Sequence, residues 1–300
     1  MRQTENKVKI TGLLSEINLE KGSYNKNGTM MERISGSVTV RVEQPINGVN
    51  TIVEIPVYQF ANKYKNDGNL NPVYEGLEKI LTSYNSIAAV GEDKADMVQF
   101  DIHSDAIRMN EYYNTNGTFV SFPRIHGSFI KKVSRDTKQE ATFSAEIFIQ
   151  SIAAEVDFNG IETDRLKITG AIFQYGDRLD QVVFYTANEN VANAIESYWN
   201  PGETVRAVGR LNFTTKTETT VEVSGFGENL EKSTTINVSE LLITGGSEQA
   251  LEGDFAISAE DVKQGMAERA LRLDETKTKN SANTVRPAPS RASAMDNLGF

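Results

Sequence analysis

Hydrophobic and polar residues alternate along most of the chain, in stretches rich in Val, Ile, Thr, Phe and Tyr. A period of two places every second side chain on the same face of an extended strand, so it predicts strands that are buried on one side. The chain is therefore predicted to be mainly β. The expected strands cover residues 7–17, 34–43, 51–60, 97–109, 118–133, 142–156, 164–175, 181–186, 204–214, 219–226 and 234–244.

Pairs of small polar residues and glycine separate many of these strands. Asn and Gly tolerate the positive φ angles that tight hairpin turns require. We therefore expect turns between antiparallel neighbours at Asn27-Gly28, Asn47-Gly48, Asn116-Gly117, Asn159-Gly160 and Gly176-Asp177.

Two segments break the alternation with the apolar spacing of a helix. The first opens with Asn71-Pro72, a capping residue followed by proline at the first helical position. Thr186 or Asn188 can cap the second, which Asn200-Pro201-Gly202 ends. Both apolar stripes are interpreted as core: Val73, Leu77, Ile80, Leu81 and Tyr84 in the first helix, and Val191, Ile195, Tyr198 and Trp199 in the second.

Each helix follows about three strands and precedes about two more, so the element order occurs twice. Three strands, a helix and two strands is the order of an OB-fold, a five-stranded Greek-key barrel. The predicted fold is thus two tandem OB-fold-like barrels, each with one short helix, followed by a C-terminal helix and a flexible tail. The expected divisions are residues 7–135 and 140–246 for the barrels, 247–275 for an acidic segment with a helix, and 276–300 for the tail.

Composition narrows the range of functions. The net charge of −10 argues against a protein that coats polyanions through its overall charge, although a local basic groove remains compatible with it. The chain has no cysteine and only two histidines, His103 and His126, which excludes disulfides, thiol nucleophiles and Cys/His zinc sites. No apolar run follows the charged start or reaches membrane-spanning length, so we expect a cytoplasmic protein without membrane contact.

Catalytic signals are weak. Both histidines lie in strand patterns without a neighbouring nucleophile motif, and no phosphate-binding glycine loop occurs. Asp93, Asp96, Asp101 and Asp105 would allow a carboxylate-dependent nuclease, but their spacing spans a loop and a strand. We therefore expect a non-enzymatic protein without a cofactor or metal.

The second copy contains a run that carries a family resemblance. Val182-Val183-Phe184-Tyr185, the helix 191–199, and Pro201 to Leu211 with its Val-Gly-Arg-Leu string resemble bacterial and phage single-stranded DNA-binding proteins. Residues 234–246 are similar to the last strand of that family. The resemblance covers about a third of the chain and implies a two-barrel relative, from a phage or mobile element, that coats or presents single strands during replication or recombination.

The C-terminus also resembles that family. Its end, Asp296-Asn297-Leu298-Gly299-Phe300, is similar to the acidic and apolar tip that recruits replication or recombination partners. The resemblance therefore implies partner contacts through Asp296, Leu298 and Phe300. Residues 276–300 depart from the family pattern, because Lys277, Lys279, Arg286 and Arg291 outnumber the acid Asp296.

Binding a single strand requires aromatic platforms for the bases and cations for the phosphates. Aromatic residues in strands also fill barrels, and lysine or arginine on a strand is often simply solvated, so each candidate has a structural alternative. The candidates for stacking are Tyr58, Tyr64, Tyr112, Tyr113, Tyr175 and Phe213. The candidates for phosphate contacts are Lys9, Arg41, Lys63, Arg108, Arg124, Lys131, Lys132, Arg206 and Arg210.

Two hypotheses from different classes remain. The first is a single-stranded DNA-binding protein that is largely indifferent to sequence. The second is a structural or virion β-barrel protein whose barrel faces make protein contacts.

Overall fold

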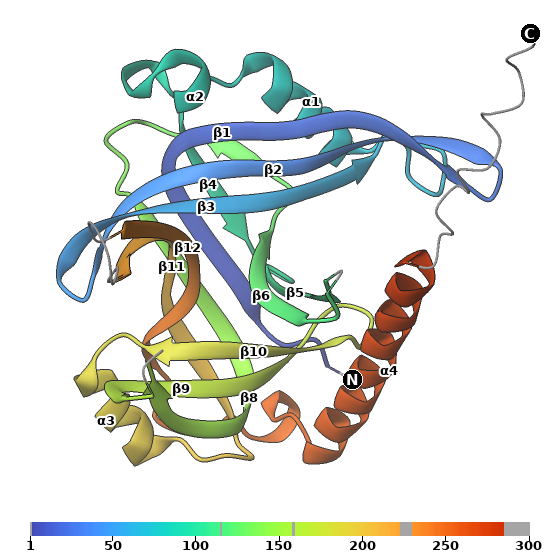
Figure 1. The fold of residues 1–300 in the computed structure, drawn as a ribbon. Helices are drawn as coiled ribbons and strands as arrows, with labels where there is room; N and C mark the ends of the chain where they lie inside the picture. The colour runs from blue at the N-terminus through green and yellow to red at the C-terminus, as the bar shows by residue number, and fades with distance from the viewer. Residues whose placement is uncertain (1, 115, 158–159, 223–229, 285–300) are drawn as a thin grey trace, which may run out of the picture.

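The computed structural model describes residues 2–114, 116–157, 160–222 and 230–284, with side chains described outside 216–236 and 278–284. Its strands form two barrels, one above the other in Figure 1. Helices α1 (Pro72–Ser83) and α2 (Ile87–Val90) lie on the first barrel and α3 (Glu189–Tyr198) on the second. Helix α4 (Ala259–Thr284) runs along one side, against strands of both.

The first barrel closes through a fixed order of strand pairs. The strand β2 lies between β1 and β3, β3 pairs in parallel with β6, and β6 pairs with β5. The strand β4, which precedes β5 in the chain, returns to β1 and also pairs with the short β7. The bounds are β1 (Asn6–Lys26), β2 (Thr29–Ile46), β3 (Val49–Asn62), β4 (Met97–Ile102), β5 (Ile107–Tyr113), β6 (Phe119–His126) and β7 (Ile130–Lys132).

The second barrel repeats this order. Its strands are β8 (Glu140–Val156), β9 (Glu162–Phe173), β10 (Leu179–Thr186), β11 (Thr204–Glu222) and β12 (Leu230–Gly246). The strand β9 lies between β8 and β10, β10 pairs in parallel with β12, and β11 closes the ring between β12 and β8. In each barrel a helix follows the third strand, so the predicted fold of two OB-fold-like barrels is confirmed.

The predicted helix starts are also confirmed. The Asn71 side chain accepts a hydrogen bond from the Val73 N–H, and the Asn188 side chain does the same for the Val191 N–H, both at 3.1 Å. These bonds satisfy amide donors that a helix start leaves unpaired. The helices bury Tyr74, Leu77 and Ile80 in α1, and Ala192 and Ile195 in α3.

Two details of the first barrel differ from the sequence prediction. The segment 97–109, expected as one strand, is interrupted after Ile102, and Asp105 has a φ of 49°. The segment 118–133 is likewise interrupted after His126. A break lets the fourth strand leave β1 and turn to pair with β6, which a single straight strand could not do.

An approximate two-fold axis relates the barrels. The strands β1 and β8 pair antiparallel, with Val8 opposite Phe143. The register of β1 shifts after Leu14, and the register of β8 shifts after Ile149. Val8 and Phe143 lie equally far along the chain before these two shifts, so they occupy equivalent positions in the two barrels. When two equivalent strands pair antiparallel and equivalent residues lie opposite each other, the interface is isologous. Here that interface forms within one chain.

Two equivalent glutamines hold this junction. Gln44, at the end of β2, donates to Leu211 O at 2.9 Å and accepts from Ala141 N–H at 3.0 Å. Gln174, just after β9, donates to Ile107 O at 2.7 Å and accepts from the Asn6 side chain at 3.1 Å. Both glutamines are buried, so each supplies hydrogen bonds that the opposite barrel needs at the interface.

Helix α4 begins within the predicted segment 247–275, where the Ser258 hydroxyl accepts from the Asp261 N–H at 3.0 Å. It continues past Asp274 to Thr284, so the helix is longer than expected and its last turns occupy part of the predicted tail. The physical reason is the absence of proline and glycine between Asp274 and Pro287. Residues 285–300, with Asp296, Leu298 and Phe300, lie outside the described part of the chain.

Candidate nucleic-acid interface

The outer face of the first barrel carries the most suggestive set of side chains. Along β3 the residues Val57 and Ala61 point inward and are buried, whereas Tyr58 and Phe60 point outward. Ser37 and Ser35 of β2 lie opposite Tyr58 and Phe60. These small neighbours leave room beside the two rings; Tyr58 is half-buried and Phe60 is 55% exposed.

Arginine side chains lie between the rings of this face. The Arg124 guanidinium of β6 lies 4.4 Å from the ring centre of Tyr58 and 5.2 Å from that of Phe122. Arg33 of β2 lies 5.3 Å from the Tyr24 ring and 5.9 Å from the Phe60 ring. Cation–π contacts of this kind hold a guanidinium flat against a ring and orient both groups. We call this surface, formed by Tyr24, Arg33, Tyr58, Phe60, Phe122 and Arg124, the aromatic–arginine face.

The two arginines of the aromatic–arginine face have no carboxylate partner. Within the part of the chain that the structure describes, neither Arg33 nor Arg124 forms an ion pair. The Nε atoms of both are buried and lack a hydrogen-bond acceptor among the same residues. A guanidinium without a carboxylate partner can bind phosphate, and an accessible aromatic ring beside it can stack on a base.

His126 lies at the edge of this face. Its ring centre is 5.8 Å from that of Tyr58. Burial, together with smaller contributions from Arg108, Arg124 and Arg178, lowers its pKa from 6.5 to about 4. The imidazole is therefore neutral at physiological pH, and the positive charge here comes from the arginines.

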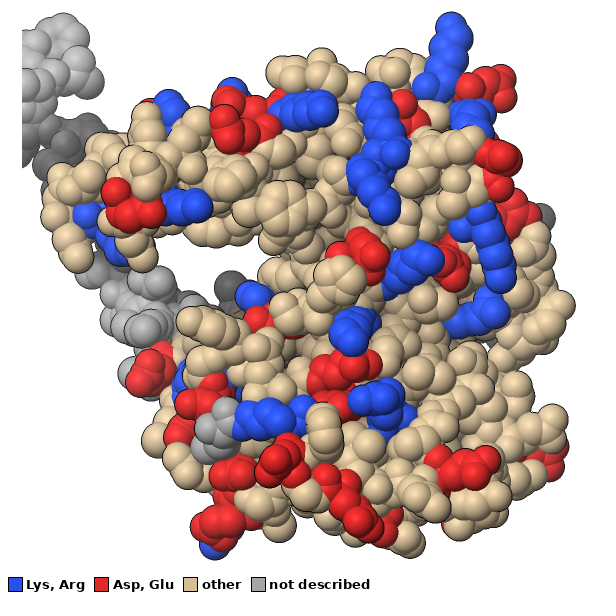
Figure 2. Space-filling model, turned by 180° about the vertical axis from the view of Figure 1, so that it is seen from behind, with Lys and Arg blue, Asp and Glu red and all other residues tan. Residues whose placement is uncertain are grey.

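A cleft between the barrels adjoins the aromatic–arginine face. It has a volume of about 790 Å³ and contains Tyr58 and Phe122 of the first barrel and Tyr185 of the second, with Arg269 of α4. Seen from behind, lysines and arginines gather on the upper right part of the surface, over the first barrel, and acidic side chains along the lower edge (Figure 2). The projecting hairpin of β1 and β2, which we call the arm, lies at upper left in that view and stands clear of the second barrel (Figure 2).

The predicted stacking residues divide into three groups. Tyr58 belongs to the aromatic–arginine face. Four others are not part of the face: Tyr64 follows β3 and is exposed beside Lys63, Tyr112 and Tyr113 end β5, and Tyr175 is 82% exposed between β9 and β10. Phe213 was a wrong choice, because it is only 5% exposed and belongs to the core of the second barrel.

Most of the predicted phosphate contacts already have partners. Lys9 pairs with Glu140, Arg41 with Glu92, Lys63 with Glu32, Lys132 with Asp96, and Arg108 lies 3.7 Å from Asp105. Lys131 is exposed on β7. Of the nine predicted cations, only Arg124 lies on the aromatic–arginine face.

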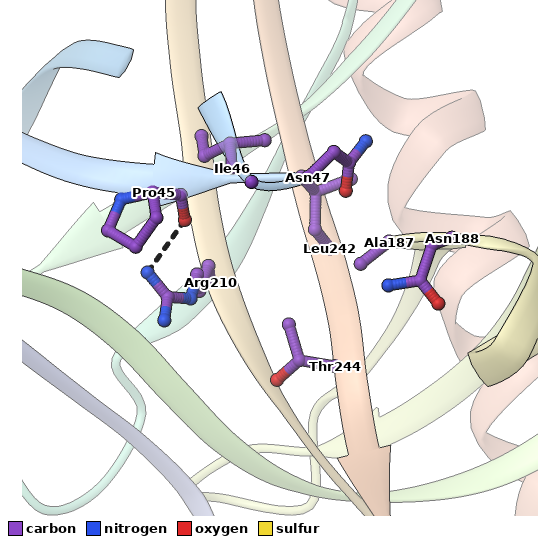
Figure 3. A pocket seen from close by; sticks show the side chains of 9 residues that line it. Pro45, Ile46, Asn47, Ala187, Asn188, Arg210, Leu242 and Thr244 are labelled. Carbon is purple, nitrogen blue, oxygen red and sulfur yellow. Dashed lines mark hydrogen bonds between the residues drawn. The ribbon is translucent and has the colours of Figure 1, made fainter. Parts of the chain in front are cut away.

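Arg206 and Arg210 are bound to protein groups as well. Arg206 and Arg2 contact the buried Glu146 at 3.0 and 2.7 Å. Burial alone would raise the pKa of Glu146, but hydrogen bonds from the Glu5 N–H, Arg2 and Arg206 outweigh it and hold that pKa below its ordinary value. Arg210 donates to Pro45 O at 2.7 Å, in a pocket of about 280 Å³ beneath the turn after β2 (Figure 3). Both arginines connect parts of the fold, so the prediction that they contact phosphate is not supported.

Three rings of the face are absent from the predicted stacking residues: Tyr24, Phe60 and Phe122. Phe122 could be predicted from the sequence, because Phe122, Arg124 and His126 occupy alternate positions on one side of β6. Tyr24 lies on the arm of β1 and β2, and its contact with Arg33 depends on how those strands pair. That pairing cannot be read from the spacing along the chain.

The geometry of the described residues gives no support to the carboxylate-dependent nuclease considered from the sequence. Among the residues that the structure describes, no three His, Asp or Glu side chains are grouped so that they could hold a metal ion. Likewise, none of the described helices is long and apolar enough to cross a membrane.

The topology and the face together define a protein with two OB-fold barrels and, among the described residues, a partly exposed surface of rings and arginines. The sequence profile of the YorF family matches residues 4–279, and the chain belongs to this family. No curated protein matches it.

Among solved structures, the chain is similar to the wild-type single-stranded DNA binding protein from Thermus aquaticus, at 10% identity and a TM-score of 0.45. That match covers 84% of this chain and 96% of that one. A deletion mutant of the same Thermus aquaticus protein matches at 10% identity and a TM-score of 0.43, over 84% of this chain and 98% of that one.

Proposed function

We propose that the protein binds single-stranded DNA on the aromatic–arginine face, largely without regard to base sequence. The observation that carries this proposal is Arg124, which lies between the rings of Tyr58 and Phe122 without a carboxylate partner among the described residues. A single strand exposes flat bases and a phosphate on every nucleotide, and this arrangement fits both. A duplex hides its bases, so it could use only the cations.

Tolerance of sequence follows from the chemistry of the face. Every base has a π face that stacks on tyrosine or phenylalanine, whereas discrimination requires hydrogen bonds to base edges. Ser35 and Ser37 are the small polar groups beside the rings. The proposed role is therefore non-enzymatic coating or presentation of single strands, and the setting we propose is replication or recombination of a phage or mobile element.

The experiment is a fluorescence-anisotropy titration of labelled oligo(dT), oligo(rU) and duplex DNA at several salt concentrations. We expect binding to oligo(dT) that exceeds binding to the duplex. The slope of log K against log[salt] should be about −0.7 for each phosphate that the protein neutralises. Equal binding to oligo(rU) would extend the proposal to single strands in general.

Variants of the face provide the specific test. Tyr58→Ala should weaken oligo(dT) binding by about 5–150-fold, the equivalent of roughly 1–3 kcal/mol for one stacked base. Arg124→Ala should weaken binding and make the salt slope shallower by about 0.7. The matched controls are Tyr198→Ala, an exposed ring on α3, and Arg41→Ala, which is paired with Glu92. Absence of single-strand binding at low salt would contradict the proposal and favour a barrel protein that makes protein contacts.

A further inference from the structure

The second barrel has a tyrosine at the position of Tyr58. Ile55 of β3 lies opposite Val40, and Val182 of β10 lies opposite Gly170, at equivalent points of the two registers. Tyr58 follows Ile55 by as many residues as Tyr185 follows Val182, so Tyr185 is the counterpart of Tyr58 in the second barrel. Both tyrosines line the cleft between the barrels. A strand that leaves the first barrel through this cleft would therefore reach a second ring.

The two barrels differ in charge at the position of Arg124. Tyr58 lies opposite His126 on β6, and Tyr185 lies opposite Leu242 on β12, so the residue two places earlier is Arg124 in one barrel and Glu240 in the other. The second barrel does have an arginine near its ring, because Arg165 of β9 lies 4.9 Å from the centre of Tyr185. That arginine comes from a different strand, and its surroundings differ from those of Arg124.

Two carboxylates neutralise Arg165. Its Nε lies 3.1 Å from Glu155 Oε2, and its Nη2 lies 3.4 Å from Glu240 Oε1. All three side chains are mostly buried, so solvent screens their charges less than it would at the surface. Burial, followed by Glu155 and Glu240, raises the pKa of the Tyr185 hydroxyl despite the opposing effect of Arg165. Arg165 itself thus faces two negative charges, while Lys167, opposite Tyr185 on β9, lines the cleft as a further cation.

We propose that the surface around Tyr185 is a second contact site for single-stranded nucleic acid that Glu155 and Glu240 keep closed, which confines strand binding to the first barrel. This inference rests on the proposed function of the aromatic–arginine face. A phosphate that approaches Arg165 meets two carboxylates, so an additional contact there is opposed by repulsion. Removal of the two charges leaves Arg165 next to Tyr185, as Arg124 is next to Tyr58.

The test uses the full chain with the double substitution Glu155→Gln/Glu240→Gln. Glutamine keeps the shape and can still accept the hydrogen bonds that Thr163 and Asn212 now donate to the two carboxylates. We expect oligo(dT) long enough to span both barrels to bind roughly 3–30-fold more tightly, because two repulsive charges are removed from a partly screened site. The salt slope should steepen by about 0.7 for each phosphate gained, and the shortest oligo(dT) that the wild type binds should show no gain.

The matched control is Glu196→Gln/Glu248→Gln. It makes the same change in net charge at two exposed positions on the side of α3 and lies outside the cleft. A gain equal to that of the control would overturn the proposal, because it would reflect net charge alone. The single variant Glu240→Gln serves if the double variant unfolds, with a smaller gain expected.

Tyr185→Ala separates the site from a general electrostatic effect. In the wild type this change should leave oligo(dT) affinity unaltered, whereas in the Glu155→Gln/Glu240→Gln background it should abolish the gain. A loss in the wild type as large as that of Tyr58→Ala would mean that the second site is already open and would overturn the proposal. Wild-type protein that binds no single strand would instead reject the proposed function, and the second site with it.

Discussion

Two groups of arginine side chains differ in what they contact. Arg2, Arg206 and Arg269 reach mostly buried carboxylates and connect distant parts of the fold. Arg33 and Arg124 lie against aromatic rings and have no acidic partner among the described residues. Since a buried carboxylate needs its cation, only the second group is available to a ligand. The function of an arginine here is therefore decided by its neighbours and not by its position in a strand.

His126 gives a residue-scale prediction about pH. The folded protein holds the pKa of this imidazole at about 4, whereas the unfolded chain takes up the proton near 6.5. Stability that depends on neutral His126 is therefore complete above pH 6.5 and is lost as the pH falls from 6.5 towards 4. After allowance for partial exposure, the loss should be about 1–2 kcal/mol. Urea unfolding at pH 7 and pH 4.5 should show a smaller pH effect in His126→Gln than in the wild type, and equal effects would contradict this assignment.

Helix α4 shows how one element connects both barrels. Its Gly265 lies against Leu179 and Phe173 of the second barrel, where a Cβ would come within 2.8 Å of the Leu179 side chain. Arg272 donates to Leu179 O at 3.0 Å, and Arg269 reaches across to Glu111 of β5 in the first barrel. The helix therefore depends on close packing on one side and on an ion pair on the other.

The ion pair of α4 is the basis of an element-scale prediction. Arg269 and Glu111 are only 12% and 6% exposed, and the two side chains meet at 2.5 Å. Arg269→Met leaves the Glu111 carboxylate buried without a cation, which should destabilise α4 docking by about 3–5 kcal/mol. Hydrogen exchange should become faster along α4. The double variant Arg269→Met/Glu111→Met should recover most of the protection, and similar exchange in all three proteins would show that packing alone holds the helix.

At the scale of the whole molecule, the two barrels behave as an internal dimer. The pairing of β1 with β8 joins both barrels in one hydrogen-bonded sheet, and Gln44 and Gln174 bond across the junction at equivalent positions. The exact symmetry of a homodimer is relaxed within one chain, so equivalent positions can carry different residues. Arg124 and Glu240 are one such pair.

The junction predicts opposite effects for chemically identical substitutions. Gln44→Met or Gln174→Met removes a buried side chain that is bonded to the other barrel, and each should cost about 1–3 kcal/mol because backbone groups lose their partners. Gln59 is equally buried, but neither its Nε2 nor its Oε1 has a hydrogen-bond partner among the described residues. Gln59→Met should therefore be neutral or stabilising. Urea unfolding of the three variants tests this, and equal losses in all three would contradict it.

Local patterns in the sequence predict most of the elements of this protein and their order. Alternation over 51–60 and the Asn71-Pro72 start of α1 are local patterns, which can be recognised from residues that are close together in the chain. The same applies to Asn27-Gly28 and Asn47-Gly48, which adopt the positive φ angles that tight turns require. Two repeats of one element order were therefore enough to predict two barrels.

Which of the candidate residues form a site depends on the tertiary structure. Lys9 and Glu140, or Arg165 and Glu240, are distant in the chain and meet only because of strand register. Phe213 and Tyr58 look alike in an alternating strand, yet the first faces the core and the second faces the cleft. Ion pairing and exposure depend on distances in space between separate strands, and the alternation of one strand contains no information about its neighbours.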